Sequence, residues 1–337
     1  MSFFDDRAAS TRTTLEHLAR RIEDDLGEDA ERVLAADTCI YVVGSGGRGE
    51  MSRHSDADLF VARVRRDPSD VDAFLVRQAI ARALFKLGLP PPSQGGSFLK
   101  MHTAEDLRRR LGTPEDDAGN TLTARMLLLL ESQPLLGAEA YGVLVNVVLE
   151  AYWTDAAARA ETFQPFALVN DVVRYWRILL LNYVAKNAER ETLRESQSER
   201  DAQRALRSYK LRFSRCMTCF SVLASLLAVT AEGGVSKEAV LDVIRRTPVE
   251  RLRALRAASG PSRDRVERHV ETLLRLYEQF LKTTDQEKSA LLEALKDPEL
   301  ARRRIQEGRE FGDAMFELLQ GLGHDGRARE LFRHMVV

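Results

Sequence analysis

The sequence is short of cysteine, of net charge and of repeated or low-complexity segments. Only three cysteines occur in 337 residues, which argues against a disulfide framework and fits a reducing compartment. Lys and Arg total 50 against 51 acidic residues, so the chain lacks the broad positive field that drives sequence-independent binding to nucleic acids. With 44% hydrophobic and 30% charged residues, a chain of this length can form two globular domains, each with its own core.

The sequence also shows neither the pattern of a secretory signal peptide nor a long apolar segment. Residues Met1 to Arg7 are acidic and have no apolar centre, unlike a signal peptide. The longest apolar run, around Cys219 to Ala231, contains Ser and Thr and falls short of the ~20 residues that a membrane helix requires. We therefore expect a cytoplasmic protein with no membrane partner.

Cys216 and Cys219 form a Cys-x-x-Cys pair, which is the spacing of some zinc and redox sites. They lie in a strongly helical, apolar stretch, and no nearby His pair completes a tetrahedral ligand set with Cys39. The favoured interpretation is two core cysteines on one helix face.

The most informative stretch begins with a short apolar run that ends at glycine. Thr38 to Val43 is β-branched and aromatic, which predicts a buried strand broken by a turn. The glycines that follow allow positive φ and let a ligand approach main-chain N–H groups without a Cβ in the way; they are Gly44, Gly46, Gly47 and Gly49. A phosphate would suit such a turn.

Two acidic residues follow the turn with one residue between them. Asp56 and Asp58 precede Leu59-Phe60-Val61, which favours a second strand starting near Ala57 with both carboxylates on one face. Neighbouring carboxylates repel each other unless a cation lies between them. Carboxylate oxygens completed by water and substrate phosphates are the ligands that Mg²⁺ prefers.

Together these residues resemble the nucleotidyltransferases of the DNA polymerase beta superfamily, whose signature is Gly-Ser or Gly-Gly followed by about a dozen residues and Asp-x-Asp. The segments Gly44–Glu50 and His54–Leu59 look most like the bacterial uridylyltransferases of the PII protein and their uncharacterised relatives. The resemblance covers roughly the first 140 residues, because Leu127–Gly137 is also similar to the end of that domain.

The resemblance implies an α+β fold, in which a small mixed sheet with flanking helices precedes an all-helical domain. The expected parts are an N-terminal helical segment 1–35, a nucleotidyltransferase domain 36–137 and a helical domain 138–337. A parallel dinucleotide-binding sheet is the main competitor, but the acids come too soon after the turn.

The resemblance also implies a site for a nucleoside triphosphate (NTP) and Mg²⁺. Asp56 and Asp58 are the expected catalytic residues and metal ligands, and Gly44 and Ser45 are expected to bind phosphates. Arg48 either contacts phosphate or pairs with Glu50 to brace the turn. The remaining expected nucleotide contacts are Ser55 and two cations of the helical domain, Lys210 and Arg215, for which a surface basic cluster is an equal alternative.

One expected feature of the superfamily is missing from the sequence. A third carboxylate often lies on the next strand, but the strand expected at Ser97 to His102 has none. Glu105 and Asp106 lie just beyond it, at a helix start where acids already stabilise the helix dipole. A displaced acid, a two-carboxylate site and weakened catalysis all stay open.

The rest of the chain is expected to be almost entirely helical. A first amphipathic helix is expected over Thr11 to Ala35, interrupted at Gly27. Another is expected over Val71 to Leu87, with Phe74, Leu75, Ala79, Ile80 and Leu84 facing inward. Pro134 to Gly137 is expected to form a turn before a further helix.

Two functions from different classes follow. The first is Mg²⁺-dependent transfer of a nucleoside monophosphate from an NTP to a hydroxyl acceptor, on a protein or a small molecule. RNA stays open as an acceptor, because the segment from Arg200 to Arg215 is locally basic. The second is a regulatory or interaction protein that binds nucleotide without turning it over.

Overall fold

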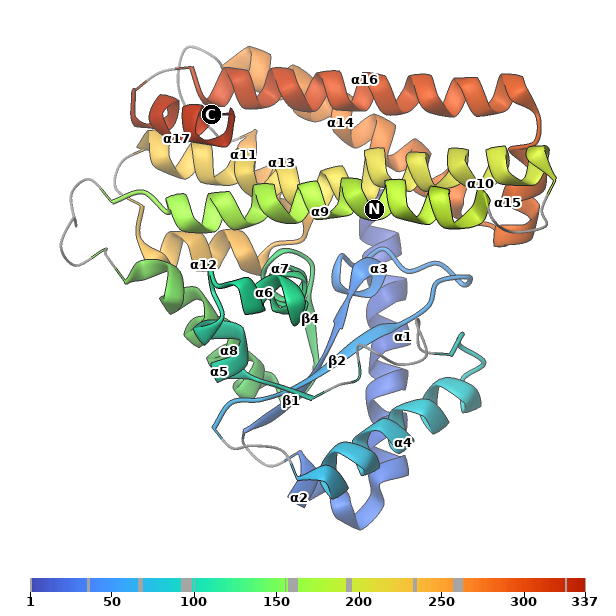
Figure 1. Cartoon of the computed structure of the whole chain (residues 1–337), viewed down its shortest axis with the longest axis vertical. Helices are drawn as coiled ribbons and strands as arrows, with labels where there is room; N and C mark the ends of the chain where they lie inside the picture. Colours follow the sequence, from blue (N-terminus) through green and yellow to red (C-terminus); the bar gives the residue numbers. More distant parts are fainter. Residues whose placement is uncertain are drawn as a thin grey trace. The chain divides into compact units, whose positions relative to one another are not determined.

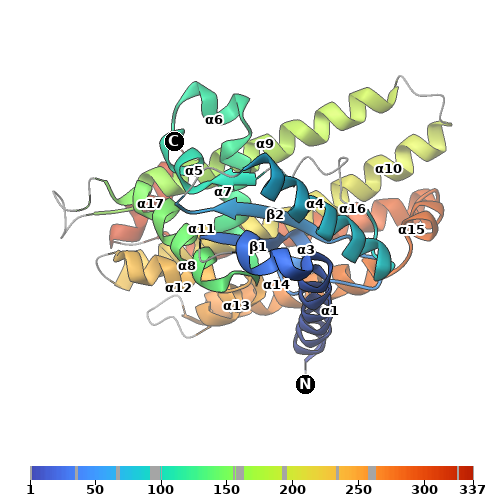
Figure 2. The ribbon, with the colours of Figure 1, turned by 90° about the horizontal axis from the view of Figure 1, so that it is seen from below.

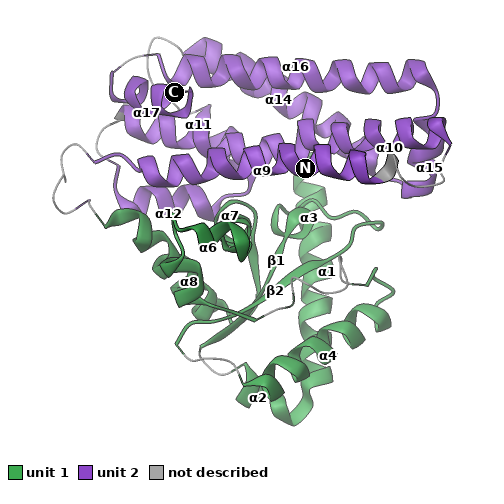
Figure 3. Ribbon diagram, in the orientation of Figure 1, with its two compact units in different colours: residues 1–154 green, residues 155–337 purple. Residues whose placement is uncertain are grey.

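The computed structural model describes residues 2–34, 37–65, 69–91, 99, 101–154, 156, 163–191, 196–232, 235–256, 263–324 and 326–336. The chain forms two compact units, residues 1–154 and 155–337 (Figure 3). The first is a mixture of helices and a small sheet, and the second has helices and no strand among its described residues. An α+β protein with a small mixed sheet is therefore confirmed.

The sheet lies in the first unit and has the strand order β3-β2-β1-β4 (Figure 1). Strands β1 (Thr38–Val43) and β2 (Asp58–Arg63) are antiparallel, and Val43 pairs with Asp58. Strand β4 (Gln133–Leu136) is antiparallel to β1, whereas β3 (Met101–Thr103) runs parallel to β2. The first strand agrees with its predicted range, and the second begins one residue after its predicted start.

The two outer strands differ from the prediction. Strand β3 begins at Met101, and half of the predicted strand, residues 97, 98 and 100, lies outside the described residues. The turn predicted at Pro134 to Gly137 is wrong in part, because residues up to Leu136 form strand β4. Proline is tolerated on an edge strand, and β4 pairs with a segment nearly a hundred residues earlier, which no local pattern indicates.

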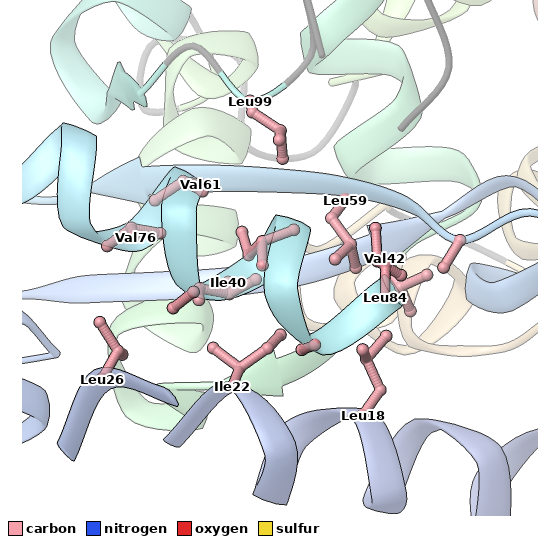
Figure 4. Close-up of a cluster of buried hydrophobic side chains, with 14 of the residues drawn as sticks. Leu18, Ile22, Leu26, Ile40, Val42, Leu59, Val61, Val76, Leu84 and Leu99 are labelled. Atoms are coloured by element: carbon pink, nitrogen blue, oxygen red, sulfur yellow. The ribbon is translucent and has the colours of Figure 1, made fainter. Parts of the chain in front are cut away.

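One face of the sheet is covered by α1 (Phe3–Leu26) and α4 (Asp70–Lys86), which lie side by side (Figures 1 and 2). Figure 4 shows the apolar cluster between these helices and the strands. Its labelled members on β1, β2 and the helices include Leu18, Ile22, Leu26, Ile40, Val42, Leu59, Val61, Val76 and Leu84. Burying one such side chain contributes about 1.5–3 kcal/mol, so this cluster holds the strands of the site in register.

Helix α4 differs from its prediction on one residue. Phe74, expected to face inward, is 62% exposed. The buried apolar residues of α4 are Ala73, Val76, Ala79, Ile80, Ala83 and Leu84. The helix carries apolar residues on two opposite sides, so the periodicity alone did not identify the inner one.

The N-terminal helix ends where the sequence predicted an interruption. At Gly27 the chain adopts a φ of 55°, and a short 3-10 turn η1 (Gly27–Asp29) leads into α2 (Ala30–Val33). Ser2 caps the start of α1 in a reciprocal capping box with Asp5. Glycine suits this break because it adopts positive φ without a steric penalty.

The remaining elements of the first unit are α5 (Ala104–Arg109), α6 (Pro114–Ala118), α7 (Thr121–Leu130), α8 (Ala138–Glu150) and η3 (Ala151–Trp153). Arg125 of α7 is fully buried and donates to the Asp116 carboxylate, the Leu107 carbonyl oxygen and the Tyr152 hydroxyl. Helix α8 packs on β1, so it belongs to the unit of the sheet. The predicted boundary after residue 137 differs from this grouping, because the apolar face of α8 is buried on the strand.

The second unit contains ten described helical elements. They are α9 (Phe166–Glu191), α10 (Gln197–Lys210), the π-helix η5 (Leu211–Arg215), α11 (Cys216–Glu232), α12 (Lys237–Arg245), α13 (Pro248–Leu255), α14 (Arg263–Thr284), α15 (Lys288–Ala294), α16 (Pro298–Leu322) and α17 (Gly326–Val336). Ser236 caps α12, and Pro248 and Pro298 are the first residues of α13 and α16.

A cluster of aromatic rings lies in the core of the second unit. Phe213 stacks on Phe280 at 4.9 Å and also contacts Tyr209 and Phe311. Cys216 and Cys219 are buried, as predicted for core cysteines, and burial raises the pKa of the Cys216 thiol to about 12. Large flat rings provide much apolar contact area for each residue.

Among the described residues, one continuous helical stretch, Gln197–Ala231, is long and apolar enough to cross a membrane by length and composition alone. The sequence predicted no membrane-spanning segment from the length of its longest apolar run, and that expectation stays a prediction. The most apolar window of the stretch has a mean hydropathy of 1.5 and is 78% buried inside the protein. A helix in the core of a folded unit has this composition too, so the burial accounts for the apolar window without a membrane.

Candidate functional site

The glycine-rich turn after β1 forms a very short helix, α3 (Gly44–Gly47). Gly44 has a φ of 65°, a conformation that favours glycine and turns the chain sharply out of the strand. The Arg48 N–H donates to the Gly44 carbonyl oxygen at 3.0 Å, and the Glu50 N–H donates to that of Ser45 at 2.8 Å. These later amides close the turn, whereas the first N–H groups of a helix have no partner within the helix itself.

Gly47 is required by close packing of the backbone. A Cβ at this position would lie 1.9 Å from the carbonyl oxygen of Glu131, far inside van der Waals contact. The side-chain amide of Gln133 donates to the Gly47 carbonyl oxygen at 2.8 Å. The absence of a side chain at Gly47 therefore lets the turn pack directly on the segment from α7 to β4.

Arg48 lies in a buried ionic cluster beside the turn. Its guanidinium donates to Glu50 at 2.7 Å and to Glu131 at 2.5 Å, and all three side chains are at most 8% exposed. The pairing with Glu50, which the sequence allowed as the alternative to a phosphate contact, is present. Glu131 is not among the predicted site residues. In the sequence it stands out only as an acidic residue directly after the apolar run of α7, because its partner Arg48 lies 83 positions away.

Asp58 lies at the first position of β2, directly opposite Val43, the last residue of β1. Leu59 and Val61 face α1 and α4, so strand alternation places Asp58 on the opposite face of the sheet. A Cβ on Gly44 would lie 3.3 Å from the Asp58 Oδ2 atom. The pairing of the strands therefore brings this half-buried carboxylate against the start of the glycine turn.

Asp56 precedes the strand and lies in the connecting loop, where its side chain is exposed. This loop is closed by serine residues. The Ser52 N–H donates to the Ser55 hydroxyl at 3.0 Å, and the Ser55 N–H donates to the Ser52 carbonyl oxygen at 3.1 Å. Ser55 therefore shapes the loop that carries Asp56, and its proposed contact with nucleotide stays a prediction.

The acids beyond β3 are engaged in helix α5. Thr103 caps this helix, and its hydroxyl donates to the Asp106 carboxylate at 2.9 Å. Glu105 pairs with Arg108 and Arg109 along the same helix. These contacts match the helix-start role predicted for the two acids, and the three residues of β3 include no carboxylate.

Lys210 and Arg215 belong to the second compact unit. Lys210 is the exposed last residue of α10, and Arg215 is the partly exposed last residue of η5. π-helical turns are rare overall, but those that occur inside a longer helix are often found at functional sites. Their contact with a triphosphate stays a prediction.

The site offers two carboxylates to a cation. Asp58 is half-buried beside the turn and Asp56 is exposed two residues earlier. Within the described ranges, no group of three or more His, Cys, Asp and Glu side chains is arranged to hold a metal ion. These ligands fit a Mg²⁺ ion that is bound by one or two carboxylates and whose remaining coordination positions are filled by water and phosphate oxygens.

No protein-family model matches the chain, and no curated protein matches it. The function proposed below therefore depends on the residues of the turn, the two acids and their geometry.

Proposed function

We propose that the protein is a Mg²⁺-dependent nucleotidyltransferase that transfers a nucleoside monophosphate from an NTP to a hydroxyl acceptor. The observation that supports it is the antiparallel pairing of Val43 with Asp58, which brings an acid of the Asp-x-Asp pair against Gly44. A turn with available N–H groups beside a carboxylate suits a phosphate chain with a bound cation. The nucleotidyltransferase fold is part of this proposal.

The residues of the turn have distinct proposed roles. Gly44 and Ser45 bind the β- and γ-phosphates through main-chain N–H groups and the Ser45 hydroxyl. Arg48 has an indirect role, because its guanidinium pairs with Glu50 and Glu131. These pairs stabilise the turn that binds the phosphates.

Asp56 and Asp58 hold the cation, which when bound neutralises the phosphate charge and lowers the pKa of the attacking hydroxyl. Asp58 is the fixed ligand, because its strand is paired on both sides. Asp56 is carried by a serine-closed loop and is the ligand free to adjust when substrate arrives.

The acceptor proposed is a hydroxyl group of a protein side chain or a small molecule in the cytoplasm. The formal net charge of −1 gives no broad basic surface for a long nucleic acid. Tight binding of single-stranded RNA with a steep dependence on salt would favour an RNA acceptor instead.

A second candidate is a protein that binds nucleotide without turning it over. It is favoured by the exposed position of Asp56 and by the absence of a carboxylate on the three described residues of β3. Fewer fixed ligands for the cation would weaken stabilisation of the transition state more than binding of the triphosphate.

Incubation with radiolabelled NTPs and a lysate of the source cells distinguishes the two candidates. An enzyme labels a macromolecule or small molecule when Mg²⁺ is present, and Asp58→Asn abolishes the label. The matched control is Glu139→Gln, which changes an exposed acid in the first turn of α8 that has no proposed role in the site. Mg²⁺-dependent NTP binding without any label supports the second candidate, and labelling that survives Asp58→Asn contradicts the enzyme proposal.

A further inference from the structure

Helix α4 presents an apolar stripe on the side that faces away from the sheet. Val71, Phe74 and Phe85 are 63%, 62% and 85% exposed. Positions 71, 74, 78, 81 and 85 recur at intervals of three and four, which places them along one face of a helix. Gln78 and Ala81 complete this outer stripe, which is about 21 Å long at 1.5 Å per residue.

This outer stripe is unusual because α4 already buries an apolar face. Its inner side chains pack in the cluster with α1 and the strands. A surface helix ordinarily places polar residues opposite its buried face. Two exposed phenylalanines aligned on the solvent side have no role in the fold of this unit, and such a contiguous patch is typical of an interaction surface.

Positive charge borders the outer stripe on both sides. Arg77 and Arg82 are exposed, one along each edge, and Lys86 continues the second edge. Among the residues that the structure describes, neither Arg77 nor Arg82 has a hydrogen-bond or ion-pair partner. Lys86 pairs with Asp25 of α1, and Asp70 is the one exposed acid among the described residues of α4.

We propose that the outer stripe of α4 binds an amphipathic helix of a partner protein whose apolar face is bordered by Asp or Glu. Spacings of three and four are the pattern by which helices recognise each other. The two arginines supply the edge charges that select an acidic partner and orient it. This inference is independent of the proposed nucleotidyl transfer.

A second copy of the chain fits the same stripe less well. Two α4 helices face to face would bring the arginine-lined edges of both copies together, and like charges across such a contact are unfavourable. A partner with acidic edges removes this repulsion and neutralises Arg77 and Arg82.

Two synthetic peptides test the proposal with the full chain. Both are three-heptad sequences with Leu at the a and d positions, but one has Glu at every e and g position and the other has Lys. Like charges at these positions keep each peptide from pairing with itself. Fluorescence anisotropy at low salt should show the Glu peptide binding at least about tenfold more tightly than the Lys peptide, with the ratio falling as salt rises.

Variants then locate the binding surface. Phe85→Ser should weaken binding of the Glu peptide about tenfold or more, because it removes the most exposed aromatic ring of the outer stripe. Arg77→Glu combined with Arg82→Glu should reverse the preference between the peptides. Phe316→Ser is the control, since it removes a 53% exposed phenylalanine of α16 in the other unit and should leave the affinity unchanged. Circular dichroism establishes that each variant is folded.

Three outcomes overturn the proposal. Equal affinity for the two peptides would show that the edge charges select nothing. Binding that survives Phe85→Ser, or no binding at all, would show that the outer stripe is not an accessible docking surface. Sedimentation of a dimer that Phe85→Ser dissociates would assign the stripe to a second copy.

Discussion

The two compact units differ in how many charged side chains they bury. In the first unit the buried Asp, Glu and Arg side chains are Arg48, Glu50, Arg63, Asp72, Asp116, Arg125 and Glu131, whereas the described part of the second unit buries only Asp171 and Arg251. The second unit buries mainly apolar side chains instead, among them the rings in contact with Phe213. Buried ion pairs cost desolvation and contribute little net stability, so the cluster of Arg48, Glu50 and Glu131 favours a role in fixing the geometry of the turn.

The largest difference in the free energy of unfolding is expected between alanine substitutions at a glycine of the turn and at a glycine of helix α8. Gly47→Ala should destabilise the first unit by more than about 4 kcal/mol, because the new Cβ would collide with the backbone at Glu131. Gly142→Ala in α8 is the matched control, since a Cβ there has nothing within 4 Å. That change should stabilise the protein by about 0.5–1 kcal/mol. Urea unfolding of both variants measures the contrast, and similar costs at the two sites would contradict the packing of the turn described above.

Replacing Arg48, the positive residue of the ionic cluster beside the turn, is expected to have the next largest effect on the free energy of unfolding. Arg48→Met leaves Glu50 and Glu131 buried without their partner and should cost about 3 kcal/mol. Arg275→Met breaks an exposed pair with Glu310 in the second unit and should cost less than about 1 kcal/mol. Chemical denaturation compares the two, and a small loss for Arg48→Met would mean that the cluster does not support the turn.

A smaller effect that depends on pH is expected at Asp72. Burial raises the pKa of this carboxyl, but hydrogen bonds from Arg63, Ser69 and Arg32 outweigh burial and hold the pKa below its usual value. A lowered pKa means that the stabilisation is complete above the pKa of the unfolded chain, about 4, and is lost as the pH falls through the folded pKa.

Asp72→Asn should therefore cost about 2 kcal/mol at neutral pH, with the cost shrinking below about pH 4. Phe213→Leu in the aromatic core of the second unit should cost about 1–2 kcal/mol at every pH in this range. Thermal unfolding of both variants between pH 7 and pH 3 tests the distinction. A cost of Asp72→Asn that stays constant with pH would contradict it.

The sequence predicted the parts of the fold and site that depend on neighbouring residues. The β1 strand and the start of β2 followed from β-branched runs bounded by glycine and acid, and the break at Gly27 followed from a residue that permits positive φ. The pairing of Arg48 with Glu50 was accessible because the two residues are two positions apart.

What the sequence could not predict depends on contacts between distant segments. Glu131 reaches Arg48 across 83 positions, and β4 was taken for a turn because its partner strand lies far earlier in the chain. Phe74 was assigned to the wrong side of α4, because a helix with two apolar faces has no single inward periodicity.

The most direct test of the central claim is calorimetry of nucleotide binding. Each NTP is titrated into the wild-type protein and the Asp58→Asn variant, once with Mg²⁺ and once with a chelator. The account predicts that at least one NTP binds only with Mg²⁺, that Asp58→Asn weakens this binding about tenfold or more, and that Glu139→Gln, at an exposed acid of α8, leaves it unchanged. Absence of Mg²⁺-dependent binding of any NTP, or equal binding by folded Asp58→Asn, would contradict the assignment of this turn and acid as a nucleotide site.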